Sequence, residues 1–377
     1  MNRHQLWVLV AVVLLCGCGS DERIIDKIGF VQSTSQDLLP DGQLKIAVSV
    51  PIANPEIKEG REFLQTEAIS SKVGQMKLAR QTNLKLVRGQ LRIILFGRSQ
   101  AEQGIWDSIG SFYRDPTVSE TVKIVIVDGD AASLLSKNYG SFPRTGKYID
   151  GIIARESGEH IIPKTTLYSF LRDYYNDGQD PIAPTIRSET DSIAVQGIGL
   201  FRDDKYVGEI NSEEGTIFTC LYRSFKRGEF TVNLTEESDK NVSVFFDSLQ
   251  SKRKVKLVRT NPGSPEIRLH LKVKASVVDY PGELDLSNDG DLQDFERKVS
   301  EEMTRRGNQI IKKLQELKAD SLGVGNFVRN SMSYKDWKEM NWREEYSKLN
   351  ITCNFTFKVK DYGFQHHHHR PPPKVSG

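Results

Sequence analysis

A short stretch near the start of the chain, Leu15 to Cys18, has the residue types and order that covalent lipid attachment needs. A small residue, Gly17, stands directly before Cys18, and an apolar run that begins after Arg3 leads up to it. A charged start, an apolar core and a small residue at the end are typical of a bacterial secretory signal, and the cysteine indicates the lipoprotein type. The sequence therefore predicts a diacylglyceryl group on the Cys18 thiol and signal cleavage between Gly17 and Cys18.

The apolar run before Cys18 is shorter than the roughly 20 residues that a membrane-spanning helix needs. An uncleaved anchor or a plain signal, with an incidental cysteine, is the alternative interpretation. Both interpretations place the remaining chain outside the cytoplasm at a membrane face. No second long apolar run follows Cys18, so the body of the protein is not expected to span the bilayer.

Composition excludes some classes of function. The 377 residues are enough for two or three domains, and 52 Lys and Arg against 50 Asp and Glu give a net charge of +2. This balance indicates neither a nucleic-acid-binding protein nor a polybasic membrane surface. Of the four cysteines, Cys16 leaves with the signal and Cys18 is predicted to carry lipid. Cys220 and Cys353 remain, either as two buried thiols on core faces or as a disulfide that sequence cannot place.

Several motifs suggest chemistry only weakly. The segment from Gly140 to Lys147 is one residue too long for a P-loop. Gly323 to Gly325 follows a predicted helix and not a strand, so it does not fit a dinucleotide-binding loop, and a helix C-terminal turn is expected there. His160 and His270 are the only histidines in predicted folded sequence, which is too few for a histidine metal cage, and His270 falls on the polar face of a strand. The sequence therefore predicts no catalytic residue, metal ligand or cofactor.

One acidic loop keeps a metal hypothesis open. Residues Asp285 to Glu296 place oxygen ligands at several positions of an EF-hand-like calcium loop, but no helix enters the loop. Capping of the following helix by Asp289 or Asp291 explains the same residues. Basic residues such as Lys272 and Lys274 alternate with an apolar strand face, as either a solvated face or a docking surface for an acidic partner loop.

Hydrophobic periodicity divides the rest of the chain into two regions. A hairpin at 26–51 and strands alternating with helices over about 60–140 predict a mixed α/β N-terminal lobe within 18–190, with irregular chain over 142–163 and a linker up to Arg187. Region 191–363 opens with a hairpin at 193–210 and continues with alternating strands and a helix at 292–318. The fold class is therefore α+β, with a C-terminal antiparallel sheet backed by a long helix. Residues 1–17 form the signal, and 364–377 a disordered tail.

The order of three segments, 87–135, 197–210 and 318–363, resembles the Ger(x)C family of spore germination lipoproteins, and the likeness extends from Cys18 to about Gly363. One departure is Gly19 to Asp21, where the family usually has Trp-Asp directly after the lipidated cysteine. The resemblance implies α+β subdomains and a non-enzymatic C subunit of a nutrient germinant receptor. It further implies assembly with the integral membrane A and B subunits at the outer face of the inner spore membrane. A solute-binding lipoprotein of a transporter is the alternative function.

Overall fold

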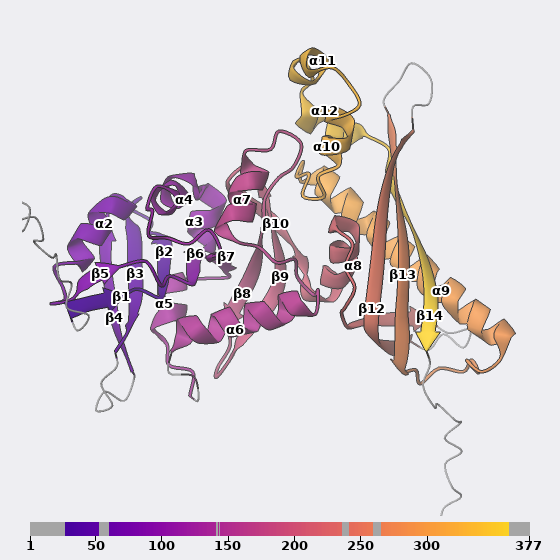
Figure 1. Ribbon diagram of the computed structural model, residues 1–377, viewed down its shortest axis with the longest axis horizontal. Coiled ribbons are helices and arrows are strands. Elements are labelled where there is room, and N and C mark those ends of the chain that lie inside the picture. Colours follow the sequence, from indigo (N-terminus) through magenta and orange to yellow (C-terminus); the bar gives the residue numbers. More distant parts are fainter. Residues whose placement is uncertain are drawn as a thin grey trace, which may run out of the picture.

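The computed structural model describes residues 27–52, 60–140, 142, 144–235, 241–258 and 265–361. Two sheets dominate the molecule, a large mixed sheet at the N-terminal end and a four-stranded sheet at the C-terminal end (Figure 1). A third, two-stranded sheet pairs β1 (Ile28–Phe30) with β5 (Lys85–Val87) in parallel. Within the described residues, no helix has the length and apolar character to cross a membrane.

The large sheet has eight strands in the order β10-β9-β8-β7-β6-β2-β3-β4, and its centre is parallel. Every residue of β6 is buried, because a parallel strand in mid-sheet is covered on both faces. The predicted hairpin is confirmed as the antiparallel pair β2–β3. The strand bounds are β2 (Ser33–Leu38), β3 (Leu44–Pro51), β4 (Arg61–Ala68), β6 (Ile93–Gly97), β7 (Lys123–Val127), β8 (Ile182–Ser188), β9 (Ile193–Arg202) and β10 (Lys205–Asn211).

The segment predicted to be a linker is instead a strand of this sheet. β8 pairs in parallel with β7 only through Thr185 and Ile186, so Pro184 removes no hydrogen bond from that ladder. On its other side β8 pairs with β9, and β10 pairs with β9. The hairpin expected to open the C-terminal region therefore completes the large sheet, which continues past the predicted boundary at 190.

Helices cover the large sheet, and one of them, α6, occupies the segment predicted to be irregular. Gly146, Gly151 and Gly158 lower its intrinsic helix propensity, but Ile149 and Ile153 are spaced four residues apart and bury one face in the core. Packing therefore outweighs propensity. The helices are α2 (Ser71–Leu78), α3 (Arg98–Gln103), α4 (Trp106–Tyr113), α5 (Ala131–Ser136), α6 (Thr145–Gly158) and α7 (Leu167–Tyr174).

The C-terminal sheet has the order β11-β12-β13-β14, and the predicted long helix α9 (Asp289–Glu316) packs against it. β13 and β14 pair in parallel, so the expectation of a wholly antiparallel sheet was wrong in this detail. The chain between these strands forms four helices, and such a long crossover permits a parallel return. The remaining bounds are α8 (Ser212–Tyr222), β11 (Phe230–Thr235), β12 (Asn241–Val258), β13 (Glu266–Asp279), α10 (Val324–Arg329), α11 (Tyr334–Glu339), α12 (Trp342–Lys348) and β14 (Ile351–Asp361).

Helix α8 links the two sheets. Its residues from Gly215 to Leu221 are all buried, which is typical of a helix enclosed by protein on every side. Ile217 and Phe218 belong to a hydrophobic core that also contains Ile198 of β9 and Phe246 of β12. One continuous core therefore holds the large sheet and the C-terminal sheet together.

Candidate functional site

The predicted lipid-attachment and cleavage residues, Cys18 and Gly17, lie outside the described residues. Description begins at Lys27, immediately before β1, and β1 lies beside β5. The histidine tail, His366 to His369, also lies outside the described residues. Lipid attachment at Cys18 therefore stays a prediction, and the site that the structure describes lies elsewhere.

The most unusual polar site of the described chain joins the two sheets through two buried aspartates. The backbone N–H of Asp320 donates to Asp180 Oδ2 at 2.8 Å, and the backbone N–H of Asp180 donates to the Asp320 carbonyl oxygen at 3.0 Å. Asp180 is 8% exposed and Asp320 is 2% exposed. Asp180 lies two residues before β8, whereas Asp320 follows α9, so the reciprocal pair connects the large sheet to the C-terminal region.

Asp320 also caps α10. Its two carboxylate oxygens accept hydrogen bonds from the backbone N–H groups of Val324 and Gly325, at 3.0 and 2.7 Å. Gly323 permits this turn because its φ of 65° lies in the left-handed region. The glycines therefore begin α10, and the predicted helix C-terminal turn at this position was wrong. That turn occurs earlier, at Lys318, which has a φ of 52°.

The backbone at Gly178 approaches the backbone of α10 so closely that only glycine fits there. A Cβ atom on Gly178 would lie 2.7 Å from the backbone N of Asn326 and 2.7 Å from the carbonyl carbon of Gly325. Beside this contact Asn326 Nδ2 donates to Gln179 Oε1 at 3.2 Å, and Arg329 donates to Asn176 Oδ1 at 2.9 Å. The segment from Asn176 to Asp180 is thus docked along α10.

Electrostatics at the junction set the charge states of these groups. Burial raises the pKa of Asp320 to about 7, although the N–H groups of Gly325 and Val324 oppose the rise. Burial also raises the pKa of Asp180, and the Arg343 guanidinium opposes that rise from 3.5 Å. Arg343 binds Asp203 in the β9–β10 turn as well. The carboxylate oxygens accept hydrogen bonds from backbone N–H groups, and Asp180 also pairs with a guanidinium. The arrangement therefore holds the chain together, and neither carboxylate is free to act as a nucleophile or base.

A groove lies between the two sheets on another side of α8. Its volume is about 820 Å³, and its described lining includes Ile152 and Arg155 of α6, Thr216 of α8, Val195 of β9 and Arg306 of α9. A neighbouring cavity of about 600 Å³ shares Ile152 and Arg155 and contains the stacked rings of Phe142 and Tyr148, 4.3 Å apart. A lining that combines apolar side chains with polar and charged groups suits a small ligand or a partner segment.

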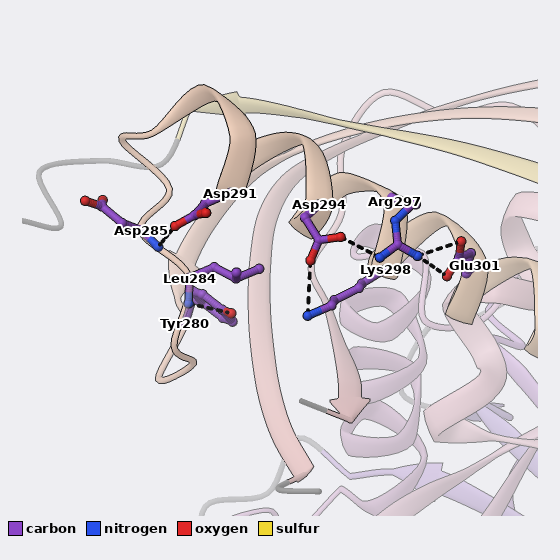
Figure 2. A network of polar contacts seen from close by, with 8 residues as sticks. All are labelled: Tyr280, Leu284, Asp285, Asp291, Asp294, Arg297, Lys298 and Glu301. Carbon is purple, nitrogen blue, oxygen red and sulfur yellow. Dashed lines mark hydrogen bonds and ion pairs between the residues drawn. The ribbon is translucent and has the colours of Figure 1, made fainter. Parts of the chain in front are cut away.

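Hydrogen bonds and ion pairs among neighbouring residues organise the acidic loop from Asp285 and the start of the helix that follows it (Figure 2). The backbone N–H of Asp285 donates to Asp291 at 2.9 Å, and the true helix cap is Asn288, whose side chain accepts from Gly290 and Asp291. Glu296 points away from the loop and binds the Lys358 ammonium and the Val359 backbone N–H. The whole loop is described, and no group of three metal-ligating residues occurs in the described chain. The fold of the described chain thus does not bring the proposed calcium ligands together, and the predicted Asp289 or Asp291 cap was wrong, since Asn288 is the cap.

The other residues singled out by sequence have structural surroundings. Cys220 and Cys353 are free and buried, as one of the two interpretations predicted, and burial raises the pKa of each thiol to about 12. His160 lies against the Phe225 ring at 4.2 Å, whereas His270 lies half-buried on the outward face of β13. The sequence did not predict the Asp180–Asp320 junction, because the two residues are 140 positions apart and no local pattern links them.

Comparison with known proteins agrees with this architecture. Residues 21–188 match the spore germination protein N-terminal domain, and residues 196–363 match the C-terminal domain described as spore germination B3/GerAC-like. The spore germination protein GerQC of Bacillus cereus is 25% identical over 367 residues, which cover 96% of this chain and 99% of that protein. The crystal structure of the GerBC protein, 17% identical, has the same fold, with a TM-score of 0.57 over 90% of this chain and 100% of that chain. The two matched domains together account for most of the sequence, and the chain belongs to the Ger(x)C family of spore germination proteins, the C subunits of germinant receptors.

Proposed function

We propose that this protein is a lipid-anchored, non-enzymatic subunit of a nutrient germinant receptor at the outer face of the inner spore membrane. Two integral membrane subunits, A and B, are its partners, and its role is to support receptor assembly and germination signalling. The observation that carries the proposal is the match of both family domains, in order, to the chain that follows the predicted anchor at Cys18.

The described site supports a non-enzymatic role. The carboxyl groups with raised pKa values at the junction, Asp180 and Asp320, are both engaged by backbone N–H groups. Perturbed carboxyl groups mark a catalytic site when they face a substrate cleft, but these two face the chain itself. Their geometry suits a rigid connection between two sheets, as a subunit needs when it transmits contact from one partner to another.

Purification from spores tests this assignment. The protein carrying an affinity tag at its C-terminus is captured from detergent-solubilised spore membranes, and the companions are identified by mass spectrometry. We expect two integral membrane subunits to be recovered in stable proportion to the tagged chain, and a tagged unrelated lipoprotein serves as the control. Recovery of the tagged chain without membrane subunits, or from the soluble fraction alone, would contradict the assignment.

The groove between the sheets gives the transporter alternative its one specific support. Its volume of about 820 Å³ suits a small solute. However, solute-binding lipoproteins usually have two similar lobes, whereas the sheets here have eight and four strands. Titration of the purified protein with amino acids and sugars separates the two functions. Tight binding with closure of the groove favours a transporter protein, and the absence of binding favours the receptor subunit.

A further inference from the structure

One part of the chain has a local charge excess that the net charge of +2 conceals. From Ala68 to Ala101 there are seven Lys and Arg residues and no Asp or Glu. Three of the seven are neutralised by ion pairs in the fold: Arg88 with Asp115, Arg92 with Asp150, and Arg98 with Asp128. The other four, Lys72, Lys77, Arg80 and Lys85, are exposed, and no ion pair with them occurs among the described residues.

Exposed apolar side chains lie among these cations. Ile69 is 79% exposed and Met76 is 54% exposed, which is unusual for such residues. Lys72 and Met76 stand four positions apart in α2 and therefore share one face of the helix. The Lys77 ammonium donates to the Glu67 carbonyl oxygen at 2.8 Å, a contact that leaves its charge unneutralised. The mixture of cationic and apolar groups is typical of segments that lie on a membrane surface.

The same surface lies beside the point where the described chain begins. A cavity of about 280 Å³ is lined by Leu78 and Ala79 at the end of α2 and by Leu86 of β5, so these elements are neighbours. β5 pairs with β1, and Ile28 lies opposite Lys85. Figure 1 shows α2, β5 and β1 together at the end of the molecule opposite the β12–β14 sheet.

The proposed lipid anchor keeps this end close to the bilayer. Cys18 and Lys27 are nine residues apart, and nine residues span at most about 30 Å when fully extended. The C-terminal sheet also presents lysines, but it lies at the other end of the molecule (Figure 1). The tether therefore selects the α2 end as the face that meets lipid.

We propose that Ile69, Lys72, Met76, Lys77, Arg80 and Lys85, here called the α2–β5 surface, dock on anionic phospholipid headgroups and orient the receptor subunit on the membrane. The ammonium and guanidinium groups bind lipid phosphates, while Ile69 and Met76 enter the interface between headgroups and acyl chains. The orientation rests on the proposed anchor at Cys18. The docking contact itself depends only on the α2–β5 surface, so the two can fail separately.

A probe at a single introduced cysteine tests the orientation. The native thiols Cys220 and Cys353 are buried, so Asn83→Cys, between α2 and β5, and Asn354→Cys, on β14, can each be labelled selectively with a fluorophore. The lipidated protein is attached to phosphatidylcholine vesicles, with or without phosphatidylglycerol, that contain a headgroup quencher. We expect the fluorophore at position 83 to be quenched only when phosphatidylglycerol is present, and the fluorophore at position 354 not to be quenched. Quenching at position 83 should disappear in about 1 M NaCl, because the Debye length there is about 3 Å. Equal quenching at both positions would overturn the proposal.

Charge reversal supplies the matched control. The triple variant Lys72→Glu, Lys77→Glu and Arg80→Glu should abolish quenching at position 83. Lys252, Lys254 and Lys256 of β12 are equally exposed, and their reversal to Glu makes the same change in net charge at the other end, so it should leave that quenching intact. Quenching that survives the first triple variant, or that needs an added membrane protein, would refute docking on lipid.

A separate measurement keeps the anchor and the surface distinguishable. The chain from residue 18 onward, carrying Cys18→Ala, is mixed with phosphatidylglycerol-containing vesicles at low salt, and sedimentation measures its partition. We expect weak binding that falls roughly a hundredfold when Lys72, Lys77 and Arg80 become Glu. Absence of binding would overturn the surface proposal, whether or not Cys18 is lipidated. Absence of lipid on the full chain would overturn the anchor alone.

Discussion

Lys252 of β12 and Lys272 of β13 lie directly opposite each other on the outward face of the C-terminal sheet. Both side chains are exposed, and His270, opposite Lys254, extends the basic row. Like charges at directly opposed positions of an antiparallel pair oppose folding. The sheet thus keeps a pair of like charges that lowers its stability. These lysines lie on the face that the sequence predicted to be either solvated or a docking surface for an acidic partner loop.

Replacement of Lys272 tests how much this repulsion weakens the fold. We expect Lys272→Glu to raise the free energy of unfolding by about 0.5–1 kcal/mol at low salt, because it converts a like-charge pair into an attractive one. Lys272→Gln, which removes the charge without reversing it, should give a smaller gain. The measurement is urea unfolding at low and high NaCl, and the gain should shrink with salt. A Glu variant less stable than the Gln variant at low salt would contradict this account.

The buried carboxyl group of Asp320 should make the junction sensitive to pH. Its pKa is raised from 3.8 to about 7, so between these values the folded state binds more protons than the unfolded state. The contribution of Asp320 to stability is therefore complete below about pH 4 and is lost as the pH rises through 7. Asp320→Asn lacks this titration, so its stability relative to the native chain should rise by on the order of 2–4 kcal/mol between pH 4 and pH 8.

Thermal unfolding of the two chains across this pH range measures the difference. Asp173 and Asp37, whose pKa values burial raises to about 6, titrate in both chains and therefore cancel. A constant difference between native and Asp320→Asn proteins would show that the group does not titrate in the folded state. The Glu302 carboxyl, whose pKa is lowered, is likewise common to both.

Steric contact between Gly178 and α10 predicts that the junction tolerates no side chain there. Gly178→Ala would place a methyl group 2.7 Å from backbone atoms of Gly325 and Asn326, which cannot move without displacing α10. We expect a loss of about 1–3 kcal/mol in unfolding free energy. Gly151→Ala is the matched control, because Gly151 lies inside α6 with no atom near its Cβ position. The free energy of unfolding of Gly151→Ala should increase by about 0.5–1 kcal/mol, because alanine has a higher helix propensity than glycine.

Calorimetry of both alanine variants compares them directly. Limited proteolysis then locates the effect, because a weakened junction should expose the segment from Asn176 to Asp180 to cleavage while β12 and β13 stay protected. Equal stability of Gly178→Ala and the native chain would show that the two backbones do not approach as closely as described.

The elements that sequence predicted well are those with a strong local period. Alternation along β13 and the apolar stripe of α9 depend only on which side of one element faces the core, so the sequence alone specifies both. Strand β8 contains Pro184, and helix α6 contains three glycines. Both are stabilised by packing against residues far away in the sequence, which a local pattern cannot reveal. The Asp180–Asp320 contact joins residues 140 positions apart, and no spacing rule could bring them together. The parallel pairing of β13 with β14 was not predicted for the same reason, because it joins strands that are far apart in the sequence.

The predicted anchor at Cys18 gives the last test. Cys18→Ala removes the thiol that the diacylglyceryl group would modify, so lipid attachment and cleavage after Gly17 should both stop. Two acyl chains hold a protein stably on a membrane, because each buried CH₂ group contributes about 0.8 kcal/mol, so their loss should lower receptor response to nutrient. The described fold begins at Lys27, and its thermal transition should stay unchanged. Labelling of spores with radioactive fatty acid, together with a germination assay, measures both effects. Incorporation of fatty acid into the Cys18→Ala protein would refute the site, and normal germination by an unlipidated protein would refute the role of the anchor.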